Sequence, residues 1–427
     1  MARSELVPSR PVVVLVDAYT SAKYLPPEFR TLGADLVHVQ STPEFMPSMP
    51  APDLSVYLAN IVHDDIDSTV ARLRRYSPIC VLAGQEPGVL LADVLAERLG
   101  LPTNGTALSS ARRDKYEMIE TLRAAGLHCA EQFKSGDVEE LVSWADRVAA
   151  YPVVVKPLQS AAGDSVVVCD TAEEVRTAAK SVLAAETIYG EANREVLVQS
   201  YLRGVEYVVD MVSYGGRRYA CGVWAYQKRL LASGRNIYDR EHLLAADEYP
   251  APELIEYVDR ALDALGVRFG PTHAEVIHTP GGPALVEVGA RIAGNMHPAF
   301  HDRCAGANQA TLTALAYLNP GRFLSEYGGR AYQKLHDAIC CTTSTELSGV
   351  VESVDDRIVD QISGLETVFG LNLKIGPGDP IRPTVDLYSS TLRIFLCGKM
   401  RALDRDYGRI EELKDRVYRI RDMTTTG

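Results

Sequence analysis

One lysine stands at the end of a β-branched segment, directly before a loop rich in small residues. Lys156 closes the run VVVK, and Pro157 and the loop 160–165 follow it. Small residues let backbone N–H groups approach an anion closely, and a lysine supplies the opposite charge. The segment therefore predicts a phosphate site, with a solvated strand end as the alternative for Lys156.

A second segment, residues 272–295, carries two carboxylates and an arginine. Glu275 and Glu287 are expected on two strands joined by a Pro-Gly-Gly turn, and a hairpin of this length can bring both carboxylates to one face. Such a pair suits Mg²⁺, which completes its octahedron with phosphate and water. Arg291 follows in a glycine-rich loop and could hold a phosphoryl group or a carboxylate. The alternative is an exposed edge hairpin.

Signatures of several common enzyme classes are missing from the sequence. There is no GxxxxGK[ST] loop, no GxGxxG after the first strand, no HExxH and no GxSxG. The late run CGKM has the Gly-Lys pair, but methionine cannot bind Mg²⁺ as the hydroxyl of a phosphate-binding loop does. These absences lower the expectation of a zinc hydrolase or a serine hydrolase.

Composition and charge limit the classes of partner that are expected for this chain. A chain of 427 residues predicts about two to four domains, and its net charge of −12 argues against nucleic acid or an anionic membrane as the main partner. No apolar run approaches the roughly eighteen residues that span a bilayer. Eight cysteines without a CxxC pair indicate reduced thiols. A cytoplasmic protein is expected.

The predicted elements divide the chain into four parts. Residues 1–108 are expected to form an open parallel α/β domain, 109–200 an α+β unit, 201–330 an antiparallel sheet with a helix over 252–266, and 331–427 a β-rich lobe. Capping boxes are predicted at Asp137 to Glu140 and at Thr171 to Glu174. A final amphipathic helix is predicted to carry Ile410, Leu413, Val417 and Ile420 on one face, and the polar segment 233–244 is predicted to be a long mobile loop beside the site.

Five motifs, taken in order, resemble those of the ATP-grasp carboxylate-amine ligases. They are RDK (113–115), VVKP (154–157), VLVQSYLRGVEY (196–207), HAE (273–275) and VEVGAR (286–291). Residues 85–105 and 378–390 look like parts of the flanking domains of the same superfamily. The chain is most similar to the bacterial L-amino-acid ligases, the dipeptide synthases of peptide-antibiotic pathways. The resemblance implies an ATP-grasp fold with an N-terminal open parallel α/β domain, a small α+β lid domain and a large C-terminal α+β domain.

The resemblance also assigns roles in nucleotide binding. It places Lys115 and Lys156 at the α- and β-phosphates, the loop with Ser160 and Gly163 over the β- and γ-phosphates, Gln199, Tyr201 and Leu202 along the adenine edge, and Glu206 at the ribose hydroxyls. The adenine strand departs from the usual pattern, because Gln199 and Ser200 stand where an acid is common.

For the metal and the substrates, the resemblance implies two Mg²⁺ ions on Glu275 and Glu287, with Mn²⁺ as a possible substitute. Arg291 would stabilise the acyl-phosphate and its tetrahedral successor. Many members have Glu-x-Asn at this motif, but Gly289 stands at the asparagine position, so the third ligand must come from water, from substrate or from Asn295. Substrate contacts are expected from Asn295, His297 and Lys228.

The expected function is that of a Mg²⁺-ATP-dependent ligase. It would activate the carboxylate of one amino acid, or a related small acid, as an acyl-phosphate, join it to the amine of another, and release ADP and phosphate. The alternatives are a carrier-bound or non-peptide amine acceptor, bicarbonate as in the biotin carboxylases, or an ATP-binding protein that has lost turnover. A homodimer is expected from the resemblance alone. The sequence does not identify the two substrates.

Overall fold

The computed structural model describes residues 10–47, 49–148, 151–159, 165–187, 192–231, 236–387 and 389–421.

A parallel α/β domain forms the N-terminal part of the chain. Four parallel strands lie in the order β3-β2-β1-β4: β1 (Val12–Val16), β2 (Asp35–Gln40), β3 (Asn60–Val62) and β4 (Pro78–Ala83). Around them lie η1 (Thr20–Tyr24), α1 (Leu25–Thr31), η2 (Leu54–Val56), α2 (Ile66–Arg74), η3 (Glu86–Gly88) and α3 (Val89–Leu99). Strand β1 is buried throughout, which explains its unbroken apolar sequence.

A small antiparallel sheet follows η4 (Ser110–Arg112) and α4 (Lys115–Ala124). Its strands lie in the order β5-β8-β6-β7: β5 (Gln132–Ser135), β6 (Val153–Pro157), β7 (Val167–Cys169) and β8 (Val196–Ser200). Helices α5 (Val138–Arg147) and α6 (Ala172–Ala184) share its apolar core. The capping box at Thr171 and Glu174 is confirmed, whereas Asp137 caps α5 through the Glu139 N–H and Glu140 accepts from Ser135.

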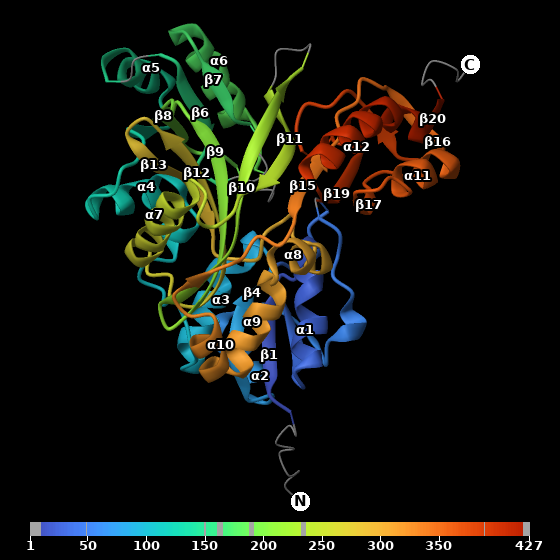
Figure 1. The fold of residues 1–427 in the computed structure, drawn as a ribbon. Coiled ribbons are helices and arrows are strands. Elements are labelled where there is room, and N and C mark those ends of the chain that lie inside the picture. Colours follow the sequence, from blue (N-terminus) through green and yellow to red (C-terminus); the bar gives the residue numbers. More distant parts are fainter. Residues whose placement is uncertain are drawn as a thin grey trace, which may run out of the picture.

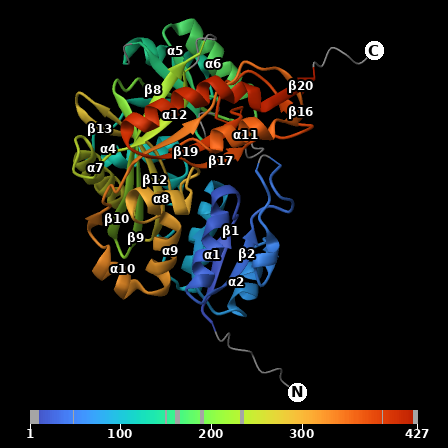
Figure 2. The ribbon, with the colours of Figure 1, turned by 45° about the vertical axis from the view of Figure 1, so that its right-hand side comes forward.

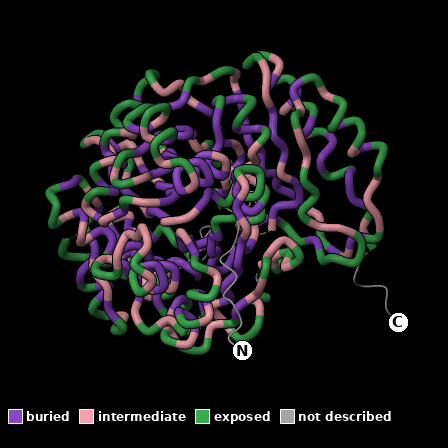
Figure 3. The backbone as a smooth tube through the Cα atoms, turned by 90° about the horizontal axis from the view of Figure 1, so that it is seen from below, coloured by how far each residue is buried: buried purple, intermediate pink, exposed green. Residues whose placement is uncertain are grey.

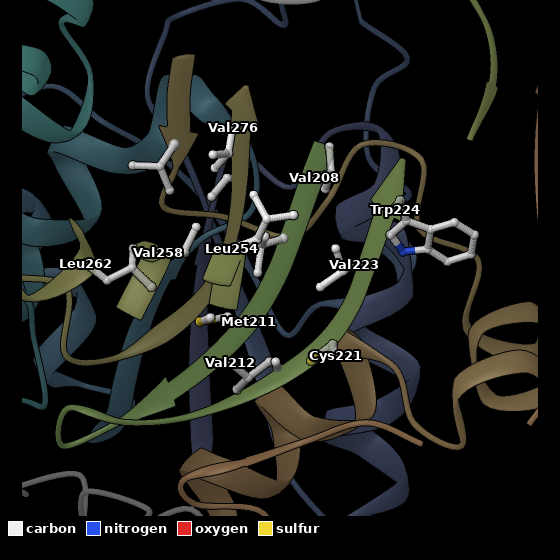
Figure 4. Close-up of a cluster of buried hydrophobic side chains, with 14 of the residues drawn as sticks. Val208, Met211, Val212, Cys221, Val223, Trp224, Leu254, Val258, Leu262 and Val276 are labelled. Carbon is white, nitrogen blue, oxygen red and sulfur yellow. The ribbon is translucent and has the colours of Figure 1, made fainter. Parts of the chain in front are cut away.

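A nine-stranded sheet forms the centre of the molecule, in the order β13-β12-β9-β10-β11-β15-β19-β17 with β14 beside β10. The strands are β9 (Val205–Tyr214), β10 (Arg217–Leu230), β11 (Asn236–Leu243), β12 (Gly270–Thr279), β13 (Gly282–Gly289), β14 (Arg330–Ala331), β15 (Asp337–Thr342), β17 (Val368–Leu373) and β19 (Leu392–Gly398). Helix α7 (Ala251–Ala264) presents Leu254, Val258 and Leu262 to one face of this sheet (Figure 4). Val276 belongs to the same apolar cluster, and because successive side chains alternate along a strand, Glu275 points to the other face.

The C-terminal lobe extends this sheet and adds a smaller one. Strands β16 (Gly349–Val354), β18 (Pro380–Ile381) and β20 (Tyr418–Arg421) pair in the order β18-β16-β20, next to α11 (Asp356–Ser363), α12 (Met400–Leu413) and η5 (Lys414–Val417). The predicted final helix is thus shorter than expected: α12 ends at Leu413, and Ile420 lies on β20. Between β13 and β14 the chain forms three helices. They are α8 (Pro298–Ala305), α9 (Gln309–Leu318) and α10 (Pro320–Glu326).

The predicted loop 233–244 is largely a strand, so this prediction is wrong for its described residues. Strand β11 pairs with β10 on one side and β15 on the other. Its buried positions alternate as Ile237, Asp239, Glu241 and Leu243. Two of these four residues are acidic, so the sequence of this segment shows no alternation of apolar and polar residues that would predict a strand. Residues 232–235 lie outside the described part of the chain.

The N-terminal sheet, the small sheet and the C-terminal lobe are arranged around the large sheet. Figure 1 shows the N-terminal sheet at one end of the large sheet, the small sheet with α5 and α6 at the other, and the C-terminal lobe beside β11. The turned view in Figure 2 brings the lobe in front and leaves the N-terminal sheet below it. Buried backbone runs through the interior of each part and exposed backbone lies at the rim (Figure 3). The predicted α/β and α+β fold class is confirmed, and the residue boundaries of the four parts stay a prediction. Among the described residues, no helix has the length and apolar character needed to cross a bilayer.

Candidate active site

A cavity of about 450 Å³ lies between the small sheet and the large sheet. Its walls come from segments that are far apart in the sequence. They include many of the predicted residues: Lys115, Lys156, Gln199, Tyr201, Leu202, Glu206, Lys228, Glu275 and Glu287. Ser160 and Gly163 lie outside the described residues. The structure thus brings both lysines and both acidic residues to one cavity.

The two lysines approach the acidic pair from separate elements. Lys115 is the first residue of α4, and its Nζ lies 2.6 Å from Glu287 Oε2. Lys156 lies on β6 with only 4% of its surface exposed. Burial and the neighbouring Lys115 ammonium lower the pKa of Lys156 to about 8, while the carboxylates of Glu287 and Glu275 act in the opposite direction. A pKa of about 8 leaves Lys156 mostly protonated at neutral pH, which suits it to bind phosphate.

The two carboxylates lie opposite each other on the β12–β13 hairpin, in direct register. Burial and the carboxylates of Glu287 and Glu206 raise the pKa of Glu275 to about 8. Burial acts to raise the pKa of Glu287, but Lys115, Lys156 and Arg291 together outweigh it, so that this pKa lies below its ordinary value. Two ionised carboxylates in direct register repel each other, and a divalent cation between them would relieve the repulsion.

The donor set fits Mg²⁺ that is shared with a nucleotide. No group of three or more His, Cys, Asp or Glu side chains in the described ranges is arranged to hold a metal by itself. Mg²⁺ binds through one or two carboxylates and fills its remaining positions with phosphate oxygens and water. Glu275 and Glu287 supply this minimum. His273 lies next to this pair. Its Nδ1 donates to Asp210 Oδ1 at 2.7 Å, and its Nε2 lies 3.9 Å from Glu275 Oε1.

Another part of the cavity wall is aromatic and polar. The rings of Tyr226 and Tyr238 lie with centroids 4.6 Å apart. Tyr238 Oη donates to Glu206 Oε1 at 2.8 Å, and Lys228 Nζ lies 2.6 Å from Glu206 Oε2. Gln199 Nε2 donates to Gln132 Oε1 at 2.8 Å, which fixes its amide on the cavity wall. Tyr238 was not predicted, because the segment that carries it was interpreted as a loop.

Arg291 is held by a residue of the N-terminal domain. Its Nε lies 3.1 Å from Glu86 Oε2, and its Nη1 donates to the Ile292 carbonyl oxygen at 3.1 Å. The second Glu86 oxygen lies 3.0 Å from Arg113 Nη1. These three side chains line a smaller cavity together with Lys115, His273, Glu287 and Gly289. The only sequence signal for Glu86 is a weak one, its position in the segment 85–105 that resembles a flanking domain.

The remaining predicted substrate residues, Asn295 and His297, line neither of these two cavities. The amide nitrogen of Asn295 donates to the carboxylate of Glu241, a buried residue of β11. His297 is the N-cap of α8, and its ring packs near Phe395 and Phe369 of the lobe and Tyr24 of the N-terminal domain. Burial lowers the pKa of His297. The metal role considered for Asn295 and the substrate role of His297 stay predictions.

Comparison with known proteins gives a consistent result. Residues 114–236 match the family of the phosphoribosylglycinamide synthetase ATP-grasp (A) domain. The chain is 34% identical over 395 residues to dapdiamide A synthase of Enterobacter agglomerans, with 90% of each protein covered. Among solved structures, it resembles an L-amino acid ligase from Bacillus licheniformis with a TM-score of 0.75 and 19% identity, over 97% of this chain and 99% of that one. A phosphoribosylglycinamide synthetase from Anaerococcus prevotii matches with a TM-score of 0.66 and 15% identity, over 97% and 100% of the two chains.

Proposed function

Because this chain belongs to the ATP-grasp carboxylate-amine ligases, we propose that it joins the carboxylate of one amino acid, or a related small acid, to the amine of another. The enzyme is an ATP-dependent ligase that forms an amide bond. The observation that carries the proposal is the convergence of Lys115 and Lys156 with Glu275 and Glu287 in one cavity. The product name of the Enterobacter relative favours a small amide natural product.

The cavity supports a specific placement of ATP. We assign the phosphates to Lys115 and Lys156 and the ribose hydroxyls to Glu206, which Tyr238 and Lys228 hold in place. The adenine would lie along Gln199, Tyr201 and Leu202, all on the cavity wall. Lys228 therefore has a role at the nucleotide as well as the substrate role expected from the sequence. The contacts of Ser160 and Gly163 with the phosphates stay a prediction from the sequence.

Glu275 and Glu287 are the residues that would hold two Mg²⁺ ions, or Mn²⁺ in their place. When bound, the ions supply positive charge to the β- and γ-phosphates. Lys115 orients Glu287 through its 2.6 Å ion pair. Arg291 presents a guanidinium to the same region, where it can hold the transferred phosphoryl group or the carboxylate that receives it.

The chemistry requires activation of an unreactive carboxylate. Its oxygen attacks the γ-phosphorus of ATP, the bond to the β-phosphate oxygen breaks, and ADP leaves. The second substrate must present a neutral amine, which attacks the acyl carbon and displaces inorganic phosphate. Phosphoryl transfer of this kind depends on positioning and charge neutralisation rather than on covalent participation of the protein. Burial of Lys156 and partial burial of the acidic pair reduce the local dielectric, so that such charges act more strongly than in water.

A pairwise screen tests the proposed function. Purified protein is incubated with Mg²⁺-ATP and the twenty proteinogenic L-amino acids in pairs, and phosphate release and product mass are measured. The expected result is phosphate release that depends on an amino acid pair, with a product whose mass is the sum of the two minus one water. ATP binding without release by any pair would support a protein that has lost turnover, and release with other amines would redirect the search to a non-peptide acceptor.

A further inference from the structure

Glu86 projects from a rigid turn at the carboxyl end of the parallel sheet. It is the first residue of η3, and Gln85 before it donates to the Ser21 hydroxyl at 2.8 Å in a buried contact. A Cβ at Gly88 would lie 2.6 Å from the Val16 carbonyl oxygen, so glycine lets the turn pack directly against the end of β1. The backbone that carries Glu86 therefore has little freedom to move away from the active site.

The carboxylate of Glu86 is shared between two guanidinium groups. It lies 3.0 Å from Arg113 and 3.1 Å from Arg291, one oxygen for each. The three side chains are 14%, 7% and 13% exposed. Ion pairs with so little solvent are screened less than pairs on an open surface. Two cations and one anion leave the cluster with a net positive charge, which suits an incoming phosphate or carboxylate.

Glu86 also occupies the space in front of Gly289. A Cβ built at position 289 would lie 2.8 Å from Glu86 Oε2 and 3.0 Å from Arg291 Cζ. Real Cβ atoms do not approach other atoms so closely, so any side chain at this position would displace the carboxylate, the guanidinium or both. The φ angle of Gly289 lies outside the left-handed region, since it is absent from the positive-φ glycines among the described residues. The need for glycine is therefore steric.

From this geometry we propose that Glu86 is the positioning residue of Arg291 and that Gly289 is glycine because Glu86 fills the space in front of it. The N-terminal domain thus sets the direction of the guanidinium that faces the transferred phosphoryl group. The inference rests on the proposed function for the role of Arg291, but the steric relation between Glu86 and Gly289 holds without it. Both carboxylate oxygens are engaged by arginines, so Glu86 acts on these arginines rather than on the metal.

Glu86→Gln tests the positioning role with a side chain of the same size. The amino acid pair that the wild-type enzyme couples best serves as substrate. We expect kcat to fall about tenfold or more, because one charged partner of a poorly solvated ion pair is removed, while the KM for ATP stays within about twofold. Glu44→Gln, at an exposed glutamate of the same domain, is expected to leave both parameters unchanged. An unchanged kcat in Glu86→Gln, or an equal loss of ATP affinity, would overturn the proposal.

Metal affinity separates positioning from direct metal binding. Binding of Mn²⁺ with ADP is measured by calorimetry for the wild type and Glu86→Gln. The proposal expects dissociation constants within about twofold of each other. A tenfold weaker Mn²⁺ affinity in the variant would identify Glu86 as a metal ligand and would contradict the proposal.

A double-mutant cycle tests the steric relation without any substrate. Gly289→Asn is expected to lower the Tm of the wild type by about 2–4 °C, because the new side chain meets Glu86. The same substitution is expected to lower the Tm of Glu86→Ala by a smaller amount, since the Glu86 carboxylate is then absent. If Gly289→Asn lowers the Tm equally in the two backgrounds, the steric relation is wrong. This measurement stands even if no amino acid pair is coupled by the wild type, a result that would refute the proposed function instead.

Discussion

Among the single charged side chains of the proposed site, Glu287, which would hold Mg²⁺, and Arg291, which would face the phosphoryl group, are the two that substitution tests best. Glu287 pairs with Lys115, and Arg291 is fixed by Glu86. We expect Glu287→Gln and Arg291→Ala each to lower the rate of phosphate release about a hundredfold or more, as is typical when one preorganised charge-stabilising group is removed. Glu256→Gln, at an exposed position of α7, serves as control. Rates near those of the wild type in either variant would contradict the assigned roles.

Glu241 gives a pH dependence of stability that can be isolated by one substitution. Burial raises its pKa from 4.5 to about 7. Between these values the folded state binds more protons at this site than the unfolded state, so the free energy of unfolding falls as the pH rises. Glu241→Gln removes this contribution. The Tm of Glu241→Gln minus that of the wild type is therefore expected to increase from pH 5 to pH 8. The corresponding change in the difference between their free energies of unfolding is up to about 3 kcal/mol.

Thermal unfolding at several pH values checks the Glu241 prediction. Glu256→Gln is the matched control, because its carboxylate is exposed on the opposite face of the sheet. A Tm difference that stays constant with pH in both variants would mean that Glu241 is not held protonated in the folded protein.

The residues that sequence analysis found and missed differ in how their partners are spaced. Lys156, Glu275 and Glu287 each lie within a short pattern of strand, turn and charge, and all three line the cavity. Glu86 acts on Arg291, a residue 205 positions later in the chain. No local sequence pattern indicates such a pair, because the contact forms only when the N-terminal domain packs against the large sheet.

At the scale of elements, the connection between β8 and β9 carries Tyr201 and Leu202, to which we assign the adenine. Gly204 lies in this connection, and a Cβ there would be 2.1 Å from the His278 carbonyl oxygen of β12. Gly204→Ala must therefore push the connection away from β12. Since Tyr201 and Leu202 lie on the same connection, we expect ATP to bind about tenfold more weakly.

Calorimetry with ATP and Mg²⁺ measures the effect of Gly204→Ala. Gly321→Ala is the control, because nothing lies within 4 Å of a Cβ at that position and its backbone is helical. The control is expected to bind ATP as the wild type does. Equal affinity in the two alanine variants would show that the packing of this connection does not determine nucleotide binding.

The elements predicted best are those whose burial is apolar. The five valine and leucine residues of β1 are all buried, and the periodic face of α7 packs as expected. Strand β11 was missed because its buried side chains include Asp239 and Glu241, which are satisfied by tertiary partners: Tyr407 of α12 donates to Asp239 at 2.7 Å. Burial of a polar strand cannot be read from hydrophobic periodicity when its partners come from another part of the fold.

At the scale of the whole molecule, the active site belongs to no single part. The small sheet contributes Lys156, the large sheet contributes Glu275 and Glu287, and the N-terminal domain contributes Glu86. The motif order predicts that Lys156, Glu275 and Glu287 meet, but it does not predict Glu86, and no single motif contains the relative positions of the sheets. A site assembled from separate parts can exclude water when they close, which an acyl-phosphate requires.

Transfer of an oxygen atom tests the central claim most directly. The acyl-donating amino acid is labelled with ¹⁸O in its carboxylate, and the products of a single round of coupling are analysed by mass spectrometry. Activation through an acyl-phosphate predicts ADP as the nucleotide product and one ¹⁸O atom in the released inorganic phosphate. Label in AMP, or inorganic phosphate without label, would contradict the account.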